Sequence, residues 1–159
     1  MTDSQTPRKL LHLDLKTGRV VIALRPDLAP NHVKRIEELV TDGFYDGVVF
    51  HRVIPGFMAQ TGDPTGTGTG GSKKGNLKAE FSREPHVRGT VSMARSASPD
   101  SANSQFFICF DTAPWLDGKY TVWGQVIEGM EHVDAVKKGD DGDNGAVSDP
   151  DAVLRMTLP

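Results

Sequence analysis

The first part of the chain alternates apolar and polar residues with a period of two, which is typical of a half-buried β-strand. The alternation covers residues 11–16, stops at Thr17-Gly18 and resumes over residues 20–24. Because Thr17-Gly18 can turn the chain, these residues predict a β-hairpin.

The period changes to a helical one over residues 27–43. Four apolar residues fall on one face of a helix with this sequence: Val33, Ile36, Leu39 and Val40. Pro30 suits a first helical turn and Gly43 suits the position after a last turn. The pattern therefore predicts a helix of about three turns.

The remaining chain consists mostly of short β-rich runs separated by Gly, Pro, Ser and Asp. They are VVFHRVI, GFMAQ, GTVSMA, SQFFICF, YTVWGQVI and DAVLRMTL. Residues 129–139 predict a second short helix, with Lys137 and Lys138 in its last turn and an inward face of Met130, Val133 and Val136. Many short strands with two helices predict an antiparallel sandwich or barrel.

Length and composition fit one folded domain. The chain has 159 residues, of which 37% are hydrophobic and 25% charged, and it has no internal repeat. We expect residues 8–159 to form the domain and residues 1–7 to be a flexible N-terminal segment.

Charge and cysteine content narrow the classes of partner. The net charge of -3 and the scattered basic residues argue against binding to nucleic acid or an anionic membrane. No apolar run reaches the length of a membrane span. Cys109 is the only cysteine, which excludes an internal disulfide. We expect a cytoplasmic monomer.

Two loop motifs resemble ligand sites but fit them poorly. Gly66, Gly68 and Gly71 match G-x-G-x-x-G, yet no helical period follows, so a surface loop is the better interpretation than a nucleotide site. Residues 140–145 (DDGDNG) resemble a calcium loop, but the twelfth position is Asp151 and not Glu. We interpret them as a solvated turn, with incidental cation binding left open.

No other pattern indicates a metal or a covalent mechanism. The five histidines show no ligand spacing, and no G-x-S-x-G elbow is present. We therefore expect no metal and no cofactor.

The segment FHRVIPGFMAQTGD (residues 50–63) is unusual because it places Arg52 and Gln60 within an apolar stretch. A guanidinium is costly to bury without a partner or a function. Strand alternation puts Phe50 and Arg52 on one face, and Met58 and Gln60 on one face. The alternative is an ordinary strand pair from which Arg52 extends into solvent.

Two later segments favour a functional surface. In SANSQFFICF, one face carries Phe106, Ile108 and Phe110, and the opposite face carries Gln105, Phe107 and Cys109. The segment APWLDGKY places Trp115 and Leu116 in a turn. If these segments converge, they form an apolar hollow of Phe57, Met58, Phe107 and Leu116 beside Arg52 and two amides.

The chain resembles the cyclophilins, which are peptidyl-prolyl cis-trans isomerases. The resemblance rests on FHRVIPGFMAQTGD, the GTGTGG loop, GTVSMAR, NSQFFICF and WLDGKYTVWGQVIEGM, and spans residues 10–158. It implies an eight-stranded antiparallel β-barrel capped by two α-helices, with a substrate groove on its outer surface. It also implies an enzyme that assists protein folding, acts on Pro-containing peptides and unfolded or flexible polypeptides, and binds cyclosporin.

The resemblance also implies roles for individual residues. Arg52 matches the catalytic arginine, and Gln60 matches the amide that orients it. The implied substrate-binding residues are Phe57, Met58, Gly68, Ala94, Arg95, Ser96, Gln105, Phe107, Trp115, Leu116 and Tyr120. Among these, the four residues of the apolar hollow match the walls of the proline pocket, and Trp115 matches a contact of peptide and cyclosporin.

The chain departs from the family pattern at a few of these positions. Tyr120 stands where animal relatives often have histidine, and Arg95 replaces a frequent asparagine at a position whose role is mainly main-chain. The loop before Gly70 is one residue shorter, and the RSASPDSAN loop one residue longer, than in common relatives. These differences affect the preferred residue before proline and the affinity for cyclosporin.

The residues themselves leave three functions open. The first is an isomerase, in which Arg52 donates a hydrogen bond to the proline nitrogen as the amide twists. The second is a non-catalytic module that binds Pro-containing segments. The third, a structural barrel, leaves Arg52, Gln60 and Gln105 without a role.

Overall fold

The computed structural model describes residues 9–159, so the segment 1–7 that we predicted to be flexible lies outside the described residues. Its elements are, in chain order, β1 (Leu10–Leu15), β2 (Gly18–Leu24), α1 (Pro30–Thr41), β3 (Arg52–Ile54), β4 (Met58–Thr61), β5 (Thr90–Met93), β6 (Phe106–Cys109), the 3₁₀ turn η2 (Pro114–Leu116), β7 (Val122–Glu128), α2 (Met130–Asp134), the 3₁₀ turn η3 (Asp141–Asp143) and β8 (Arg155–Thr157).

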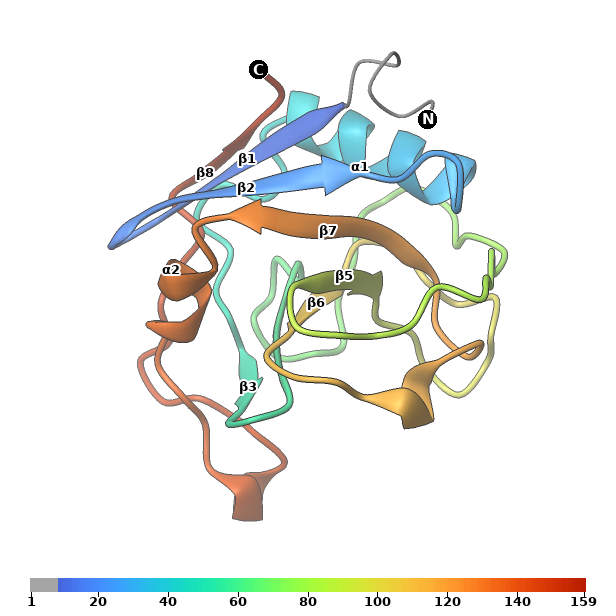
Figure 1. Cartoon of the computed structure of the whole chain (residues 1–159). Coiled ribbons are helices and arrows are strands. Elements are labelled where there is room, and N and C mark those ends of the chain that lie inside the picture. The colour runs from blue at the N-terminus through green and yellow to red at the C-terminus, as the bar shows by residue number, and fades with distance from the viewer. Residues whose placement is uncertain (1–8) are drawn as a thin grey trace.

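The eight strands form one curled antiparallel sheet in the order β3-β4-β6-β5-β7-β2-β1-β8 (Figure 1). This confirms the expected eight-stranded antiparallel fold. The edge strands β3 and β8 do not pair with each other. Residues 144–153 lie between them and make isolated bridges to the β3 side, at Val49–Ala152 and Arg52–Ala146. The barrel is therefore closed by an irregular segment at the edge that carries Arg52.

The first helix has the bounds that its sequence pattern predicts. Pro30 begins it, and it ends at Thr41, two residues before Gly43, which has a positive φ of 72°. The apolar face predicted from the period is buried, and two polar residues are buried with it. His32 contacts Glu80 through Nδ1 at 2.7 Å, and Arg35 donates to the Asn103 carbonyl oxygen at 3.2 Å.

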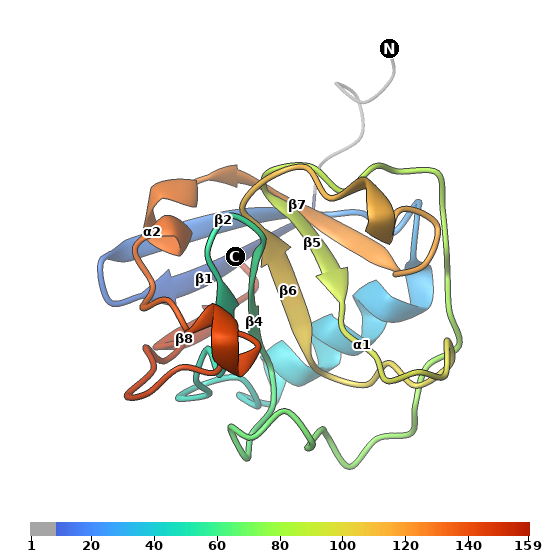
Figure 2. The same ribbon diagram turned by 90° about the horizontal axis from the view of Figure 1, so that it is seen from below.

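The second helix is shorter than predicted. It ends at Asp134, so Lys137 and Lys138 follow it and do not form its last turn. Val133 and Val136 are buried as expected. The Lys138 ammonium folds back and donates to the main-chain oxygens of Asp134 and Val136, which satisfies carbonyls that a longer helix would have paired. Figure 2 shows α1 and α2 on opposite sides of the curled sheet. Within residues 9–159, no helix has the length and apolarity to cross a membrane.

Two apolar clusters occupy the two faces of β6. Phe106 and Ile108 join the main core inside the sheet, and Phe107 and Cys109 join a smaller cluster on the outer face. This confirms the two faces that alternation predicts. The prediction that Phe50 and Arg52 share a face is wrong: Phe50 lies in the main core, because β3 begins only at Arg52 and regular alternation does not extend back to Phe50.

Candidate active site

The register of the sheet places the candidate catalytic residues side by side. Arg52 on β3 pairs with Gln60 on β4, and Gln60 pairs in turn with Phe107 on β6. Residues that pair directly across antiparallel strands project from the same face. Figure 2 shows β4, β6 and β5 as neighbours, so these side chains form one row across the outer surface of the sheet.

An apolar hollow of about 90 Å³ opens beside this row. It is lined by Arg52, Phe57, Met58, Gln60, Ala94, Arg95, Phe107, Leu116 and Tyr120. Met58, Phe107 and Leu116 are buried, and Phe57 is half-buried at the rim. The four apolar residues singled out in the sequence thus converge on one hollow with Arg52. The interpretation of Arg52 as an ordinary solvent-facing side chain does not fit this arrangement.

The guanidinium of Arg52 is held by three hydrogen bonds. Nη1 donates to Gln60 Oε1 at 3.1 Å, Nε donates to the Asn144 carbonyl oxygen at 3.0 Å, and Nη2 donates to Asn144 Oδ1 at 3.0 Å. Burial lowers the pKa of Arg52, but an arginine stays protonated at neutral pH. The group is therefore a fixed cationic donor at the edge of an apolar hollow.

Sequence reasoning missed Asn144. The residue lies in the DDGDNG segment, which we interpreted only as a solvated turn, and 92 positions separate it from Arg52. Its φ of 55° is left-handed, which is uncommon for a residue other than glycine. The Asn-Gly pair at this point signals a tight turn, but nothing local indicates that the turn contacts Arg52.

A chain of amide hydrogen bonds continues from Gln60. Gln60 Nε2 donates to Gln105 Oε1 at 2.9 Å, and Gln105 Nε2 donates to the carbonyl oxygens of Gly68 and Gly70 at 3.1 and 2.9 Å. Gln105 therefore connects the orienting amide to the glycine-rich loop. Its contact with a bound peptide stays a prediction.

The glycine-rich loop is organised by Asp63. The buried carboxylate accepts hydrogen bonds from the backbone N–H groups of Thr65, Thr67, Gly68 and Gly70. Burial alone would raise the pKa of Asp63, but these bonds and one from the Thr65 hydroxyl outweigh it and lower the pKa to about 2. The loop is thus fixed by an internal carboxylate, and we see no strand–loop–helix arrangement around it that would hold a nucleotide.

A second hollow of about 310 Å³, lined mostly by glycines and polar residues, adjoins the first. Gln60, Ala94 and Arg95 line both, so the two hollows form one groove. The predicted residues Gly68, Ser96 and Gln105 line the second hollow only. The site residues predicted from the sequence are therefore divided between two adjoining parts of one surface.

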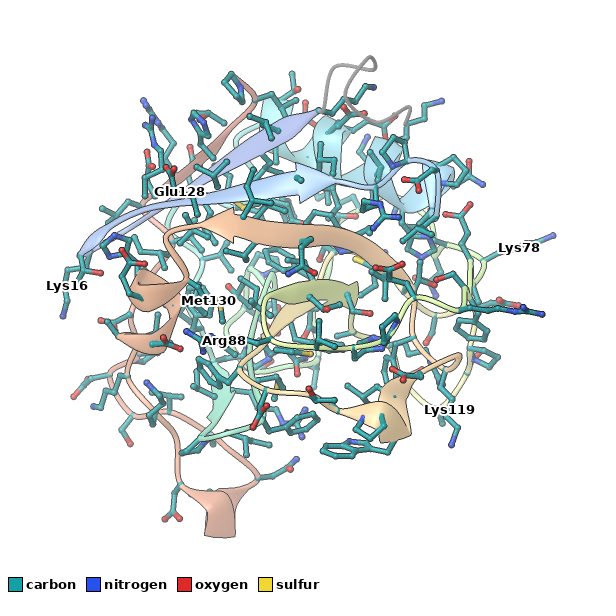
Figure 3. The ribbon with its side chains drawn as sticks, viewed as in Figure 1. Lys16, Lys78, Arg88, Lys119, Glu128 and Met130 are labelled. Atoms are coloured by element: carbon teal, nitrogen blue, oxygen red, sulfur yellow. The ribbon has the colours of Figure 1, made fainter. Side chains whose placement is uncertain are left out.

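The side chain of Arg95 takes part in the groove, beyond the main-chain role that we expected. Its guanidinium carbon lies 4.7 Å from the centroid of the Tyr120 ring, and its Nε donates to the Lys119 carbonyl oxygen at 2.9 Å. Tyr120 meets Phe107 edge-on at 5.7 Å. The side chain of Lys119 itself extends outward, past η2 (Figure 3). Arg95 and Tyr120 together form the rim between the two hollows.

Trp115 lies apart from the two hollows. It lines neither of them, and 58% of its surface is exposed. Its ring packs on the outer side of Phe57 at 5.5 Å. Leu116, the next residue, turns inward and is buried, so the apolar pair is split between the surface and the pocket wall.

Metal ligation is not indicated by the side chains that the structure describes. Among the described side chains of residues 9–159, which do not include that of Asp141, no group of three or more His, Cys, Asp or Glu is placed to hold a metal ion. Cys109 packs beneath the apolar hollow, where burial raises the pKa of its thiol to about 12.

Comparison with known proteins points to the same family as the sequence motifs. The model of the family "Cyclophilin type peptidyl-prolyl cis-trans isomerase/CLD" matches residues 10–158. A probable peptidyl-prolyl cis-trans isomerase of Brucella suis is 55% identical over 163 residues, which cover 96% of this chain and 83% of that protein. Peptidyl-prolyl cis-trans isomerase B of Bacillus subtilis is 44% identical over 125 residues, which cover 77% and 86%.

Solved structures show the same fold. A cyclophilin-type isomerase of Cryptosporidium parvum superposes with a TM-score of 0.88 at 27% identity, and the match covers 96% of this chain and 98% of that one. A second structure of that protein, in the presence of the dipeptide Ala-Pro, gives a TM-score of 0.87 at 28% identity and covers 95% and 99%. The chain belongs to the cyclophilin family of peptidyl-prolyl cis-trans isomerases.

Proposed function

We propose that this isomerase works through Arg52, oriented by Gln60, at an apolar pocket that holds the substrate proline. The observation that carries the proposal is the guanidinium fixed by three hydrogen bonds at the edge of the hollow formed by Phe57, Met58, Phe107 and Leu116. The Ala-Pro dipeptide in the Cryptosporidium structure supports proline as the group that the pocket accepts.

The chemistry needs a donor rather than a nucleophile. Resonance gives the amide C–N bond a rotation barrier of roughly 18–20 kcal/mol. When the bond twists, the proline nitrogen regains its lone pair and becomes a hydrogen-bond acceptor. Gln60 and Asn144 engage three of the guanidinium N–H groups, which leaves one on each Nη atom for the substrate. A donor that bonds the twisted amide more strongly than the planar one lowers the barrier.

The second hollow would hold the residues next to proline. Its lining includes backbone of Gly68 to Gly71 and the side chains of Arg95, Ser96 and Gln105, so it offers polar groups to an extended peptide. The apolar hollow would then grip the ring while the polar hollow holds the flanking chain. This division explains why the candidate residues form one groove with two different parts.

Replacement of Arg52 by Ala tests the proposal. Loss of one preorganised donor lowers turnover by about two to three orders of magnitude in comparable sites, so we expect a loss of this size with the fold retained. Arg88→Ala is the matched control, because Arg88 pairs with Asp134 on the surface beside α2 (Figure 3). The measurement is NMR exchange spectroscopy of a Pro-containing peptide. Unchanged turnover in Arg52→Ala would refute the assignment.

We propose cyclosporin as an inhibitor. The support is the exposed ring of Trp115 beside Phe57, which extends the apolar surface beyond the pocket. We expect inhibition at micromolar drug and a weaker effect on Trp115→Ala. Full activity of the unaltered protein at that concentration would contradict this part of the proposal.

We also propose that the protein acts in the cytoplasm, as a monomer, on unfolded or flexible chains and thereby assists folding. An open surface groove suits an extended chain, and the buried Cys109 suits a reducing compartment. Cell fractionation, size-exclusion chromatography with light scattering, and refolding of a client limited by proline isomerisation test these three points separately.

A further inference from the structure

Behind the proline pocket lies a hydrogen-bonded triplet, Asp117–His86–Ser92, that the chemistry above does not use. His86 Nδ1 lies 3.0 Å from Asp117 Oδ1, and His86 Nε2 lies 3.0 Å from Ser92 Oγ. The backbone N–H of His86 also donates to Asp117 Oδ1 at 2.7 Å. His86 and Ser92 are fully buried, whereas the Asp117 side chain is 37% exposed.

The triplet has the residue types of a serine hydrolase triad, but it cannot act as one. A nucleophile has to reach a substrate carbonyl carbon. Ser92 lies within β5 without exposed surface, and its Oγ also contacts the Thr121 carbonyl oxygen at 3.0 Å. The triplet therefore acts on the protein itself and not on a bound acyl group.

Two members of the triplet, His86 and Ser92, lie next to the Phe107 wall of the proline pocket. Ser92 pairs with Phe107 in the β5–β6 register. It thus extends the row of paired residues that runs from Arg52 through Gln60 to Phe107. The His86 ring stacks on Phe107, with centroids 6.2 Å apart and planes inclined by 18°.

The segment with the other wall is anchored to the same histidine. Asp117 directly follows Leu116, and the Ala113 N–H, just before η2, donates to the His86 carbonyl oxygen at 2.9 Å. His86 therefore connects the strand that bears Phe107 to the turn that bears Leu116. A shift of its ring would move both walls.

Asp117 determines which nitrogen of His86 carries the proton. An ionised carboxylate only accepts hydrogen bonds, so Nδ1 is the donor in the pair, and Nε2 faces the Ser92 hydroxyl. Burial lowers the pKa of His86, against the opposing effect of the Asp117 carboxylate. Burial and the Asp117 carboxylate raise the pKa of the Cys109 thiol on β6 to about 12, so this thiol is neutral at pH 7.

We propose that His86 is a positioning residue: with Asp117 and Ser92 it holds the Phe107 and Leu116 walls at the separation that grips the proline ring. The inference rests on the pocket assigned under Proposed function. It requires that the triplet affect capture of the proline-containing peptide and leave the donor chemistry of Arg52 in place.

Replacement of Asp117 separates these effects. Asp117→Ala removes the acceptor that orients His86, and we expect KM to rise about tenfold, the equivalent of one charge-assisted hydrogen bond, with kcat retained. Asp117→Asn keeps an oxygen at the acceptor position, and its KM should stay within about threefold of the unaltered protein. Asp111→Ala is the control, because among the described residues the Asp111 side chain bonds only the neighbouring Thr112 N–H.

The outcomes distinguish this inference from the assignment of the pocket. An unchanged KM in Asp117→Ala, or a loss of kcat at constant KM, overturns the positioning role. Turnover retained in Arg52→Ala defeats the pocket assignment instead. Should Asp117→Ala fail to fold, the unaltered protein supplies the test. Saturation with a Pro-containing peptide should shift the ring ¹⁵N resonances of His86, and unshifted resonances overturn the proposal.

Discussion

The side-chain part of the support that Asn144 gives to Arg52 can be removed without disturbing the backbone. Asn144 has a φ of 55°, a conformation that glycine adopts without strain. Asn144→Gly therefore keeps the main-chain oxygen that accepts from Arg52 Nε and removes the side chain, whose Oδ1 accepts from Nη2 at 3.0 Å. The substitution isolates a single hydrogen bond to the guanidinium.

The size of the effect follows from the exposure of this bond. A hydrogen bond to a charged group contributes about 1.5–3 kcal/mol when it is shielded from water. Because Asn144 is exposed, we expect about 1 kcal/mol, below that range. At about 1.4 kcal/mol per factor of ten, kcat/KM should fall about fivefold. The loss should appear mainly in kcat, because a less ordered guanidinium meets the twisted nitrogen less often.

The assay is kcat and KM for a Pro-containing peptide, measured with the thermal unfolding midpoint of each variant. Asp149→Gly is the matched control, since Asp149 is the other non-glycine residue with a positive φ among residues 9–159, at 49°, and is exposed. Full activity of Asn144→Gly would refute the reasoning. So would an equal loss in Asp149→Gly, because the effect would then come from the added glycine and not from the lost bond.

Two further predictions concern groups near the groove. Asp63 has a folded pKa of about 2, below the unfolded value of about 3.9, so its stabilisation is complete above pH 4 and is lost as the pH falls toward 2. The free energy of unfolding lost in this way is about 2.5 kcal/mol. Between pH 6 and 2, the urea midpoint should therefore fall less steeply for Asp63→Asn than for the unaltered protein. An equal pH dependence of the two proteins contradicts the account. Cys109 is fully buried with a thiol pKa of about 12, so a disulfide reagent should label it only at the rate of unfolding. Fast labelling in native buffer contradicts this expectation.

Local periodicity predicted the regular elements because their stabilising contacts lie close together in the sequence. The bounds of α1 follow from Pro30, Gly43 and the apolar face between them, and the two faces of β6 follow from alternation. The end of α2 could not be read in this way. Lys138 lies after the end of α2, and its side chain folds back to bind the main-chain oxygens of Asp134 and Val136. The two lysines therefore resemble the last turn of a helix in sequence but do not form one.

The candidate site was predictable where it depends on motifs and hidden where it depends on tertiary contacts. Family motifs supplied Arg52, Gln60 and the pocket walls, and the register of β3, β4 and β6 brings them together. The bond from Arg52 to Asn144 and that from His86 to Asp117 join residues 92 and 31 positions apart. Such contacts leave no periodic signal, since neither partner has to follow a local pattern.

The irregular closure between β3 and β8 affects when the candidate site can form during synthesis of the chain. The asparagine that fixes the guanidinium of Arg52 follows that arginine by 92 positions in the chain. A chain still attached to the ribosome thus contains Arg52 well before it contains the Asn144 that orients the guanidinium. Full isomerase activity should therefore arise only after Asn144 has been synthesised and has folded against Arg52.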